Sequence, residues 1–144
     1  YFTIVKSKKA VLYTDGASSG NPGASGIGVV LDCEGKTHEI SEYIGFATNN
    51  VAEYTALIRG LEKAKALGVQ EIKACLDSEL LVKQLTGQYK VKNERLKELH
   101  KKALRLLGSF KTFSVRHIPR DKNKKADSLA KKAAASQKQT LLTI

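Results

Sequence analysis

Apolar positions change their spacing along the chain, and this spacing predicts five strands and four helices. Short apolar runs and alternating apolar positions, bounded by turn residues, predict strands over residues 10–14, 27–31, 37–46, 69–76 and 110–118. Apolar positions three and four residues apart predict helices over residues 49–67, 78–85, 93–107 and 123–138. The first three strands are joined by tight turns, and a crossover helix makes the fourth strand parallel to the first. The pattern therefore predicts an α/β fold with a five-stranded mixed sheet, its first three strands antiparallel, flanked by helices.

A single domain is expected to account for the 144 residues, of which 42% are hydrophobic, with residues 1–9 and 139–144 as peripheral tails. The two cysteines, Cys33 and Cys75, have no metal-ligand spacing and are expected to be buried free thiols in a reducing compartment. No apolar run approaches the roughly 18 residues that span a membrane. We therefore expect a soluble, cytoplasmic monomer without a membrane partner.

The charge balance favours a polyanionic partner. Lys and Arg number 25 against 14 Asp and Glu, which gives a formal net charge of +11. Such an excess most often indicates a nucleic acid, because each neutralised phosphate releases counterions. A basic surface kept for solubility is the alternative, and the motifs must decide between the two.

Asp15 lies at the end of the first predicted strand, and a glycine-rich segment follows it. Gly16 is expected to let the backbone turn sharply just after this carboxylate. The later glycines leave room for another backbone or for a phosphate; they are Gly20, Gly23, Gly26 and Gly28. The alternative is a simple hairpin in which Asp-Gly is ordinary turn chemistry.

Three further carboxylates lie at the ends of predicted elements: Glu53, Asp77 and Asp127. Each has a structural alternative. Asp77 can be a helix N-cap, and Asp127 can complement the macrodipole of the last helix. Asn50 and Glu53 have the spacing of a capping box. Asp15 and Asp77, however, follow adjacent parallel strands, so we expect them side by side.

Together the four acids favour a metal site. Clustered carboxylates repel one another unless a positive charge lies among them. Oxygen ligands of this kind suit Mg²⁺, with Mn²⁺ as an alternative. Two such ions, about 3.5–4 Å apart, can activate a water and stabilise the leaving oxygen of a phosphodiester. The sequence therefore indicates phosphodiester hydrolysis.

Four motifs, in this order, resemble the signature blocks of type 1 ribonuclease H. They are Tyr13-Thr14-Asp15-Gly16 with Gly20-Asn21-Pro22-Gly23, Thr48-Asn49-Asn50-Val51-Ala52-Glu53, Asp77-Ser78 and Asn123-Lys124-Lys125-Ala126-Asp127. The resemblance covers residues 10–134 and implies the ribonuclease H fold with strand order 3-2-1-4-5. It also implies endonucleolytic cleavage of the RNA strand of RNA/DNA hybrids by two Mg²⁺ ions, leaving 5′-phosphate and 3′-hydroxyl ends. Double-stranded RNA is considered as a further substrate of the compact form, because it shares the A-like geometry and the 2′-hydroxyls.

The resemblance implies roles for individual residues. The acids that would hold the metals are Asp15, Glu53, Asp77 and Asp127. The residues that would contact the hybrid are Asn21, Thr48, Asn49 and Asn50, with Ser78 as a weaker candidate. Amides suit this role because they can both donate to and accept from a 2′-hydroxyl. Ordinary turn and cap chemistry is the alternative for these positions.

Two features depart from the family pattern. Many bacterial members carry an additional basic helix and loop that grips the hybrid, whereas here residues 85–90 lead almost directly into the next long helix. Contacts to the hybrid are then expected from one of two other basic sets, with ordinary solvated helix faces as the alternative: Lys90, Lys92, Arg95, Lys101 and Lys102, or Lys122, Lys124 and Lys125. The mobile histidine that helps product release has two candidates here, His117 and Arg120, of which we favour Arg120.

Two other functions are weighed against this one. A nucleic-acid-binding module could keep the fold and the charge without turnover, but the intact set of four acids argues against it. An exonuclease or integrase-like nuclease could use the same fold, but the asparagine motifs argue against that.

Overall fold

The computed structural model describes residues 7–142. In chain order the elements are β1 (Lys9–Gly20), β2 (Gly23–Cys33), β3 (Lys36–Ala47), α1 (Asn49–Ala66), β4 (Glu71–Leu76), α2 (Glu79–Leu85), α3 (Glu94–Gly108), β5 (Thr112–His117), the 3₁₀ helix η1 (Arg120–Lys122) and α4 (Lys124–Leu142). The strands form one sheet in the order β3-β2-β1-β4-β5. β1, β2 and β3 pair antiparallel, whereas β4 runs parallel to β1 and β5 parallel to β4. The predicted fold class and strand order are confirmed.

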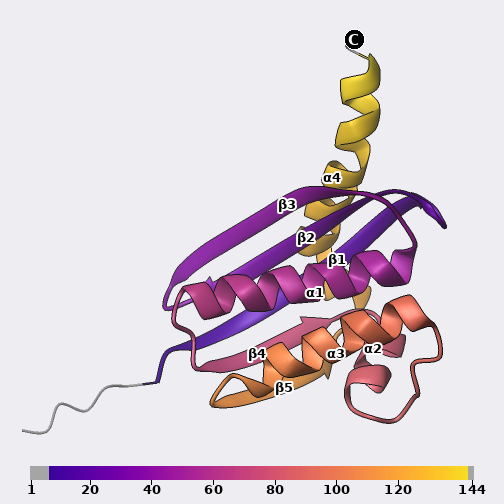
Figure 1. Ribbon diagram of the computed structural model, residues 1–144. Helices are drawn as coiled ribbons and strands as arrows, with labels where there is room; N and C mark the ends of the chain where they lie inside the picture. The colour runs from indigo at the N-terminus through magenta and orange to yellow at the C-terminus, as the bar shows by residue number, and fades with distance from the viewer. Residues whose placement is uncertain (1–6, 143–144) are drawn as a thin grey trace, which may run out of the picture.

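Helices cover both faces of the sheet, as Figure 1 shows. α1 packs on β1 and β2 with α3 beside it, whereas α4 packs on β1, β2 and β3 from the opposite face. The C-terminal part of α4 extends past the sheet. The main core lies between the sheet and α1, and Leu12, Leu31, Tyr54, Leu57 and Leu61 are fully buried there.

β1 continues well past Asp15, so the predicted sharp turn after this residue is wrong. Asp15 and Gly16 both pair with β2, and the chain reverses only at Asn21-Pro22. Gly16 is needed for a different reason. A Cβ atom at this position would lie 2.5 Å from the backbone nitrogen of Glu53 in α1. Gly16 therefore lets α1 approach the strand.

Two further glycines admit α4 in the same way. A Cβ atom on Gly26 would lie 2.6 Å from the backbone oxygen of Ala130, and one on Gly28 would lie 2.7 Å from its backbone nitrogen. The helix contributes only small side chains at this contact, because Ala126, Ala130 and Ala133 are buried. The expectation that the glycines leave room for another backbone is confirmed at these positions.

The starts of two helices decide between the alternatives for the acids. Thr48 caps α1 through its side chain, so the structural alternative of a capping box between Asn50 and Glu53 does not hold. Ser78 caps α2 in the same way. Asp77 consequently lies one residue outside the cap, and its carboxylate is not the N-cap of α2.

The ends of the chain are described only in part. α4 continues to Leu142, beyond the predicted end at residue 138. Residues 1–6 and 143–144 of the predicted tails lie outside the described residues. Among residues 7–142, no helix combines the length and the apolar character needed to cross a membrane.

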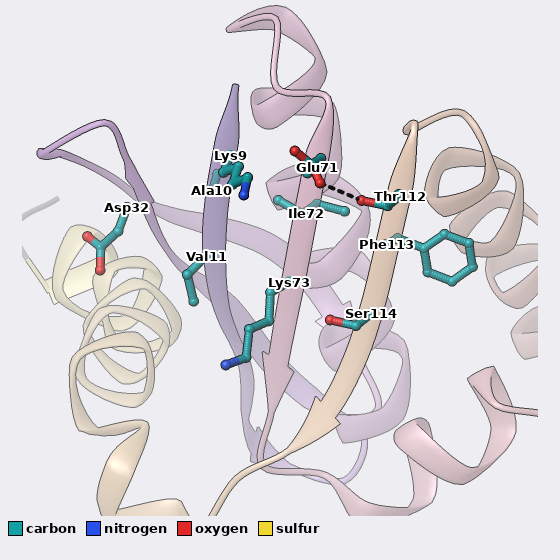
Figure 2. Close-up of a pocket in the computed structure, with 10 residues that line it drawn as sticks. All are labelled: Lys9, Ala10, Val11, Asp32, Glu71, Ile72, Lys73, Thr112, Phe113 and Ser114. Atoms are coloured by element: carbon teal, nitrogen blue, oxygen red, sulfur yellow. Dashed lines mark hydrogen bonds between the residues drawn. The ribbon is translucent and has the colours of Figure 1, made fainter. Parts of the chain in front are cut away.

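Part of the sheet forms a groove of about 390 Å³ along β1, β4 and β5 (Figure 2). Val11, Lys73 and Ser114 line it, and the hydroxyl of Thr112 donates a hydrogen bond of 3.2 Å to the carboxylate of Glu71. These residues belong to the amino-terminal parts of their strands. The groove is therefore remote from the carboxyl ends of β1 and β4, where the predicted site lies.

We expect Gly28→Ala to lower the free energy of unfolding by about 2–3 kcal/mol, because the added methyl would overlap the backbone of α4. Gly108→Ala is the control, since a Cβ atom there meets nothing within 4 Å. The control should change stability by less than about 1 kcal/mol. Urea unfolding of both variants measures this difference, and equal losses would contradict the packing account.

Candidate active site

The parallel pairing of β1 with β4 brings two carboxylates together. Asp15 and Asp77 each follow the last residue pair that joins the two strands. Glu53 reaches the same point from α1, where its Oε1 accepts a hydrogen bond of 3.0 Å from the backbone N–H of Gly16. One oxygen from each of the three acids lies within 4.8 Å of the others. The expectation that Asp15 and Asp77 lie side by side is confirmed.

Asp127 approaches these acids from α4. It hydrogen-bonds with Asp15 and forms an ion pair of 3.0 Å with Lys131, one helical turn further on. It is not among the three acids whose oxygens meet within 4.8 Å. All four acids nevertheless line one pocket of about 350 Å³, together with Gly16, Ala17, Ser18, Asn49, Asn50, Ser78, Arg120 and Lys131.

Burial and repulsion change the proton affinity of these acids. Asp15 is only 5% exposed, and burial, followed by the hydrogen bond with Glu53 and its charge, raises the pKa of Asp15 to about 10. Burial also raises the pKa of Glu53, although hydrogen bonds with Asp15 and Gly16 oppose this. Burial acts on Asp127 as well, but its hydrogen bonds with Asp15 and Lys131 outweigh burial and lower its pKa.

This set of donors fits a hard divalent cation. Carboxylate oxygens are the ligands that Mg²⁺ and Mn²⁺ take, and Asp15, Glu53 and Asp77 offer three within a small space. Burial first, and then the neighbouring acids, raise the pKa of Asp15, so this carboxyl resists ionisation unless a positive charge is placed beside it. A divalent ion would supply the missing charge, and Asp127 could contribute a further oxygen.

Arg120 and His117 lie on the segment between β5 and α4. Arg120 lines the acidic pocket, and its charge favours the ionised forms of Glu53 and Asp127. His117 is the last residue of β5, and its Nε2 lies 3.3 Å from the backbone oxygen of Asp77. Both residues therefore lie beside the acids, and Arg120 is the one whose charge acts on them.

The residues expected to contact substrate surround the acids. Asn49, Asn50 and Ser78 line the pocket. The Oδ1 atom of Asn21 accepts a hydrogen bond of 3.0 Å from the backbone N–H of Asn49. This bond fixes the side-chain amide of Asn21 at the start of α1. Thr48 and Ser78 cap α1 and α2, so the cap chemistry that we considered as an alternative is present at both positions.

Sequence reasoning missed a groove that adjoins the start of α1. It has a volume of about 650 Å³ and lies between the end of β3, one face of α1 and the start of α3. Phe46 on β3 is 76% exposed, and Arg59 and Arg95 line the groove. The signal for this groove in the sequence was the helical spacing of Thr48, Thr55 and Arg59, which places them on one face of α1. The spacing could not indicate that β3 and α3 complete the groove.

The basic residues expected to contact a substrate do not share one surface, and Arg95 belongs to the groove beside α1. Lys90, Lys92 and Lys101 line a groove of about 570 Å³ next to the connection between α2 and α3. Lys102 and Lys125 instead form surface ion pairs, with Glu62 at 3.9 Å and Glu39 at 3.3 Å. Lys131, which was not predicted, lies closest to the acids, and its spacing of four residues from Asp127 was the available signal.

Known proteins share this sequence pattern. Residues 13–133 match the profile of a family described as reverse transcriptase-like. Ribonuclease HI of Halobacterium salinarum is 44% identical over 123 residues, which cover 84% of this chain and 62% of that protein. The bifunctional protein Rv2228c of Mycobacterium tuberculosis is 42% identical over 134 residues, which cover 90% of this chain and 37% of that protein. The chain thus spans only part of the length of these curated relatives.

Solved structures share the fold. Ribonuclease H1 from Halobacterium salinarum superimposes with a TM-score of 0.85 at 42% identity, covering 89% of this chain and 98% of that one. LC11-RNase H1, solved in complex with an RNA/DNA hybrid, gives a TM-score of 0.83 at 45% identity, covering 89% and 98%. All four acids lie within the residues that match the family profile. On these grounds the chain belongs to the type 1 ribonuclease H family.

Proposed function

We propose that this protein is an endonuclease that hydrolyses the RNA strand of RNA/DNA hybrids and leaves 5′-phosphate and 3′-hydroxyl ends. The proposal includes two divalent ions, Mg²⁺ with Mn²⁺ as an alternative. The observation that carries it is the meeting of Asp15, Glu53 and Asp77 within 4.8 Å at the ends of adjacent parallel strands. The net charge of +11 and the hybrid bound to LC11-RNase H1 support the choice of substrate.

The acids have to give up a proton before they can hold the ions. Asp15, Glu53 and Asp77 would provide the central ligands, and Asp127 would add an oxygen from α4. Bound divalent ions would supply an activated water and stabilisation of the leaving oxygen. Because the pKa of Asp15 is raised to about 10, ion binding must displace its proton, so affinity for the ions should rise with pH.

Arg120 is suited to hold the phosphate that is being cleaved. It lines the same pocket as the acids, and a guanidinium can donate two parallel hydrogen bonds to phosphate oxygens. Arg120 would also assist product release, because its guanidinium could let go of the cleaved phosphate and bind water instead. His117, beside Asp77, is the second candidate for this step.

The start of α1 is suited to recognise the strand that is cleaved. Asn49 and Asn50 face the acidic pocket, and an amide can both donate to and accept from a ribose 2′-hydroxyl. Asn21, Thr48 and Ser78 would support this contact from the neighbouring turn and caps. Double-stranded RNA presents the same groups, so we include it as a second substrate.

The groove beside α1 is suited to hold the other strand of the duplex. Phe46 offers an exposed aromatic face on which a base or sugar can stack. Arg59 and Arg95 form exposed ion pairs, with Glu42 at 3.4 Å and with Glu98 at 3.9 Å, and phosphates would compete for their guanidinium groups. The groove begins at Thr48, next to Asn49 of the acidic pocket. A duplex whose one strand crosses the acids can therefore place its other strand here.

Cleavage of four end-labelled substrates tests the proposed function: RNA/DNA hybrid, RNA duplex, single-stranded RNA and DNA duplex. Internal cuts in the RNA of the hybrid are expected with Mg²⁺ and none with chelator. Asp77→Asn should reduce the rate by about 100-fold or more, because it removes a ligand charge. Glu34→Gln, in an exposed turn, is the control and should cleave normally. Binding without cleavage under every metal would favour a binding module instead.

We expect Asp15→Asn to stabilise the metal-free protein at pH 8 while abolishing cleavage. The folded pKa of Asp15, about 10, lies above its ordinary value of 3.8. Its contribution to stability is therefore complete below pH 3.8 and is lost as the pH rises toward 10. The neutral amide avoids this loss, and we expect a gain of about 2 kcal/mol at pH 8 and little change at pH 4. Urea unfolding at both pH values, with chelator, measures it. A variant less stable than wild type at pH 8 would contradict this account.

Phe46→Ala and Arg59→Ala, each in the Asp77→Asn background, test the groove. Each should weaken binding of a labelled hybrid by about 5- to 10-fold, which corresponds to about 1–1.4 kcal/mol. Phe113→Ala is the matched control, because Phe113 is an exposed aromatic residue on β5, remote from the groove. Fluorescence anisotropy measures the dissociation constants. If either variant loses no more affinity for the hybrid than the control does, the groove does not bind the hybrid.

A further inference from the structure

Asn123 is a buried amide that joins both strands of the candidate active site. Only 2% of the residue is exposed. Its Nδ2 atom donates to the backbone oxygen of Thr14 at 2.9 Å and to Oδ2 of Asp77 at 3.0 Å. Thr14 directly precedes Asp15. One side chain therefore holds the ends of β1 and β4 at the point where the acids meet.

The chemistry of the two partners fixes the orientation of this amide. A backbone oxygen and an ionised carboxylate can only accept, so the NH₂ group must face them. The Oδ1 atom of Asn123 is then left buried, and no described residue provides it with a partner. An unpaired buried polar atom costs about 1–3 kcal/mol. An apolar residue would avoid this cost, but the backbone oxygen of Thr14 and Oδ2 of Asp77 would lose the donor that Asn123 provides.

Asn123 also lies between two further pocket residues along the chain. Its backbone N–H donates to the oxygen of Arg120 at 3.0 Å, and its backbone oxygen accepts from the N–H of Asp127 at 3.1 Å. Arg120 and Asp127 both line the acidic pocket. The position of Asn123 therefore links these residues to Asp77.

A neutral donor suits an acid that has to bind a cation. The amide of Asn123 holds one oxygen of Asp77 without cancelling the charge of the carboxylate. A lysine in this place would hold it as well, as Lys131 holds Asp127, but its charge would compete with a cation for the carboxylate. The amide fixes the direction of Asp77 and leaves its attraction for a divalent ion intact.

We propose that Asn123 is a positioning residue, which fixes the carboxylate of Asp77 for a divalent ion and ties it to α4. The inference rests on the proposed metal-dependent cleavage. Removing the hydrogen-bond partner of a metal ligand typically changes metal affinity or activity by about 10- to 100-fold. A residue that only supports the fold would lower stability without this effect.

The test compares Asn123→Ala with Gln84→Ala in two measurements. The first is a Mn²⁺ titration of the protein alone by calorimetry, and the second is the Mg²⁺ dependence of hybrid cleavage. Gln84 is a matched control because it is a buried amide, 6% exposed, whose Oε1 accepts a hydrogen bond of 2.6 Å from Tyr54 and not from an active-site group. Thermal unfolding with chelator reports the structural cost of each change.

Asn123→Ala is expected to raise the Mn²⁺ dissociation constant, and the Mg²⁺ concentration for half-maximal cleavage, by about tenfold or more. At saturating Mg²⁺ its KM for the hybrid should match that of wild type, because Asn123 does not face substrate. Gln84→Ala should lower the unfolding temperature and leave both metal measurements unchanged. If Asn123→Ala does not fold, Asn123→Ser, which keeps one donor, takes its place with an intermediate loss expected.

The outcomes separate this inference from the proposed function. If wild type binds Mn²⁺ and the Asn123 variant binds it equally well, the positioning role is overturned and the proposed function stands. A parallel shift in Gln84→Ala would also overturn it, because general destabilisation would then explain both variants. If wild type neither binds Mn²⁺ nor cleaves the hybrid with any divalent ion, the proposed function itself is overturned.

Discussion

The backbones of α1 and α4 lie directly against β1 and β2, and the candidate active site depends on this close packing. Gly16 admits α1 and Gly28 admits α4, because a Cβ atom at either position would overlap the helix backbone. The two helices arrive from opposite faces of the sheet. They bring Glu53 and Asp127 to the same carboxylate, Asp15. Larger side chains on the strands would hold the helices away and separate the acids.

The same packing brings buried carboxylates close together, and the protein's own groups offset their mutual repulsion only in part. Asp15 keeps a proton at neutral pH because burial and the neighbouring acids raise its pKa. Lys131 and Arg120 favour the ionised form of Asp127, and Asn123 donates to Asp77 without adding charge. A fold optimised for stability alone would not gather these groups. Their arrangement is understandable if a divalent cation completes the site, since one ion would neutralise two carboxylates.

α1 connects the chemistry of the site with the recognition of a duplex. Its first turns carry Glu53 toward the acids and Asn49 and Asn50 toward the pocket. Another face of the same helix, including Thr55 and Arg59, lines the adjoining groove. One helix thus sets the distance between the proposed cleavage site and the groove proposed to bind the second strand of the duplex. In our proposal, the groove lined by this helix and α3 takes the place of the basic extension found in other members of the family.

The order of apolar runs by itself predicted a five-stranded mixed sheet, because connection rules leave few topologies for three short-linked strands followed by a crossover helix. The strand order came from the family resemblance. The motifs likewise singled out the four acids that line one pocket in the structure. The predicted turn after Asp15 was wrong, because a glycine in the sequence does not reveal whether it serves a turn or a neighbouring helix. Only the tertiary structure decided that Asn123 holds Thr14, 109 residues away, and that Phe46 borders a groove. Such contacts follow from how helices pack on the sheet, which local spacing does not encode.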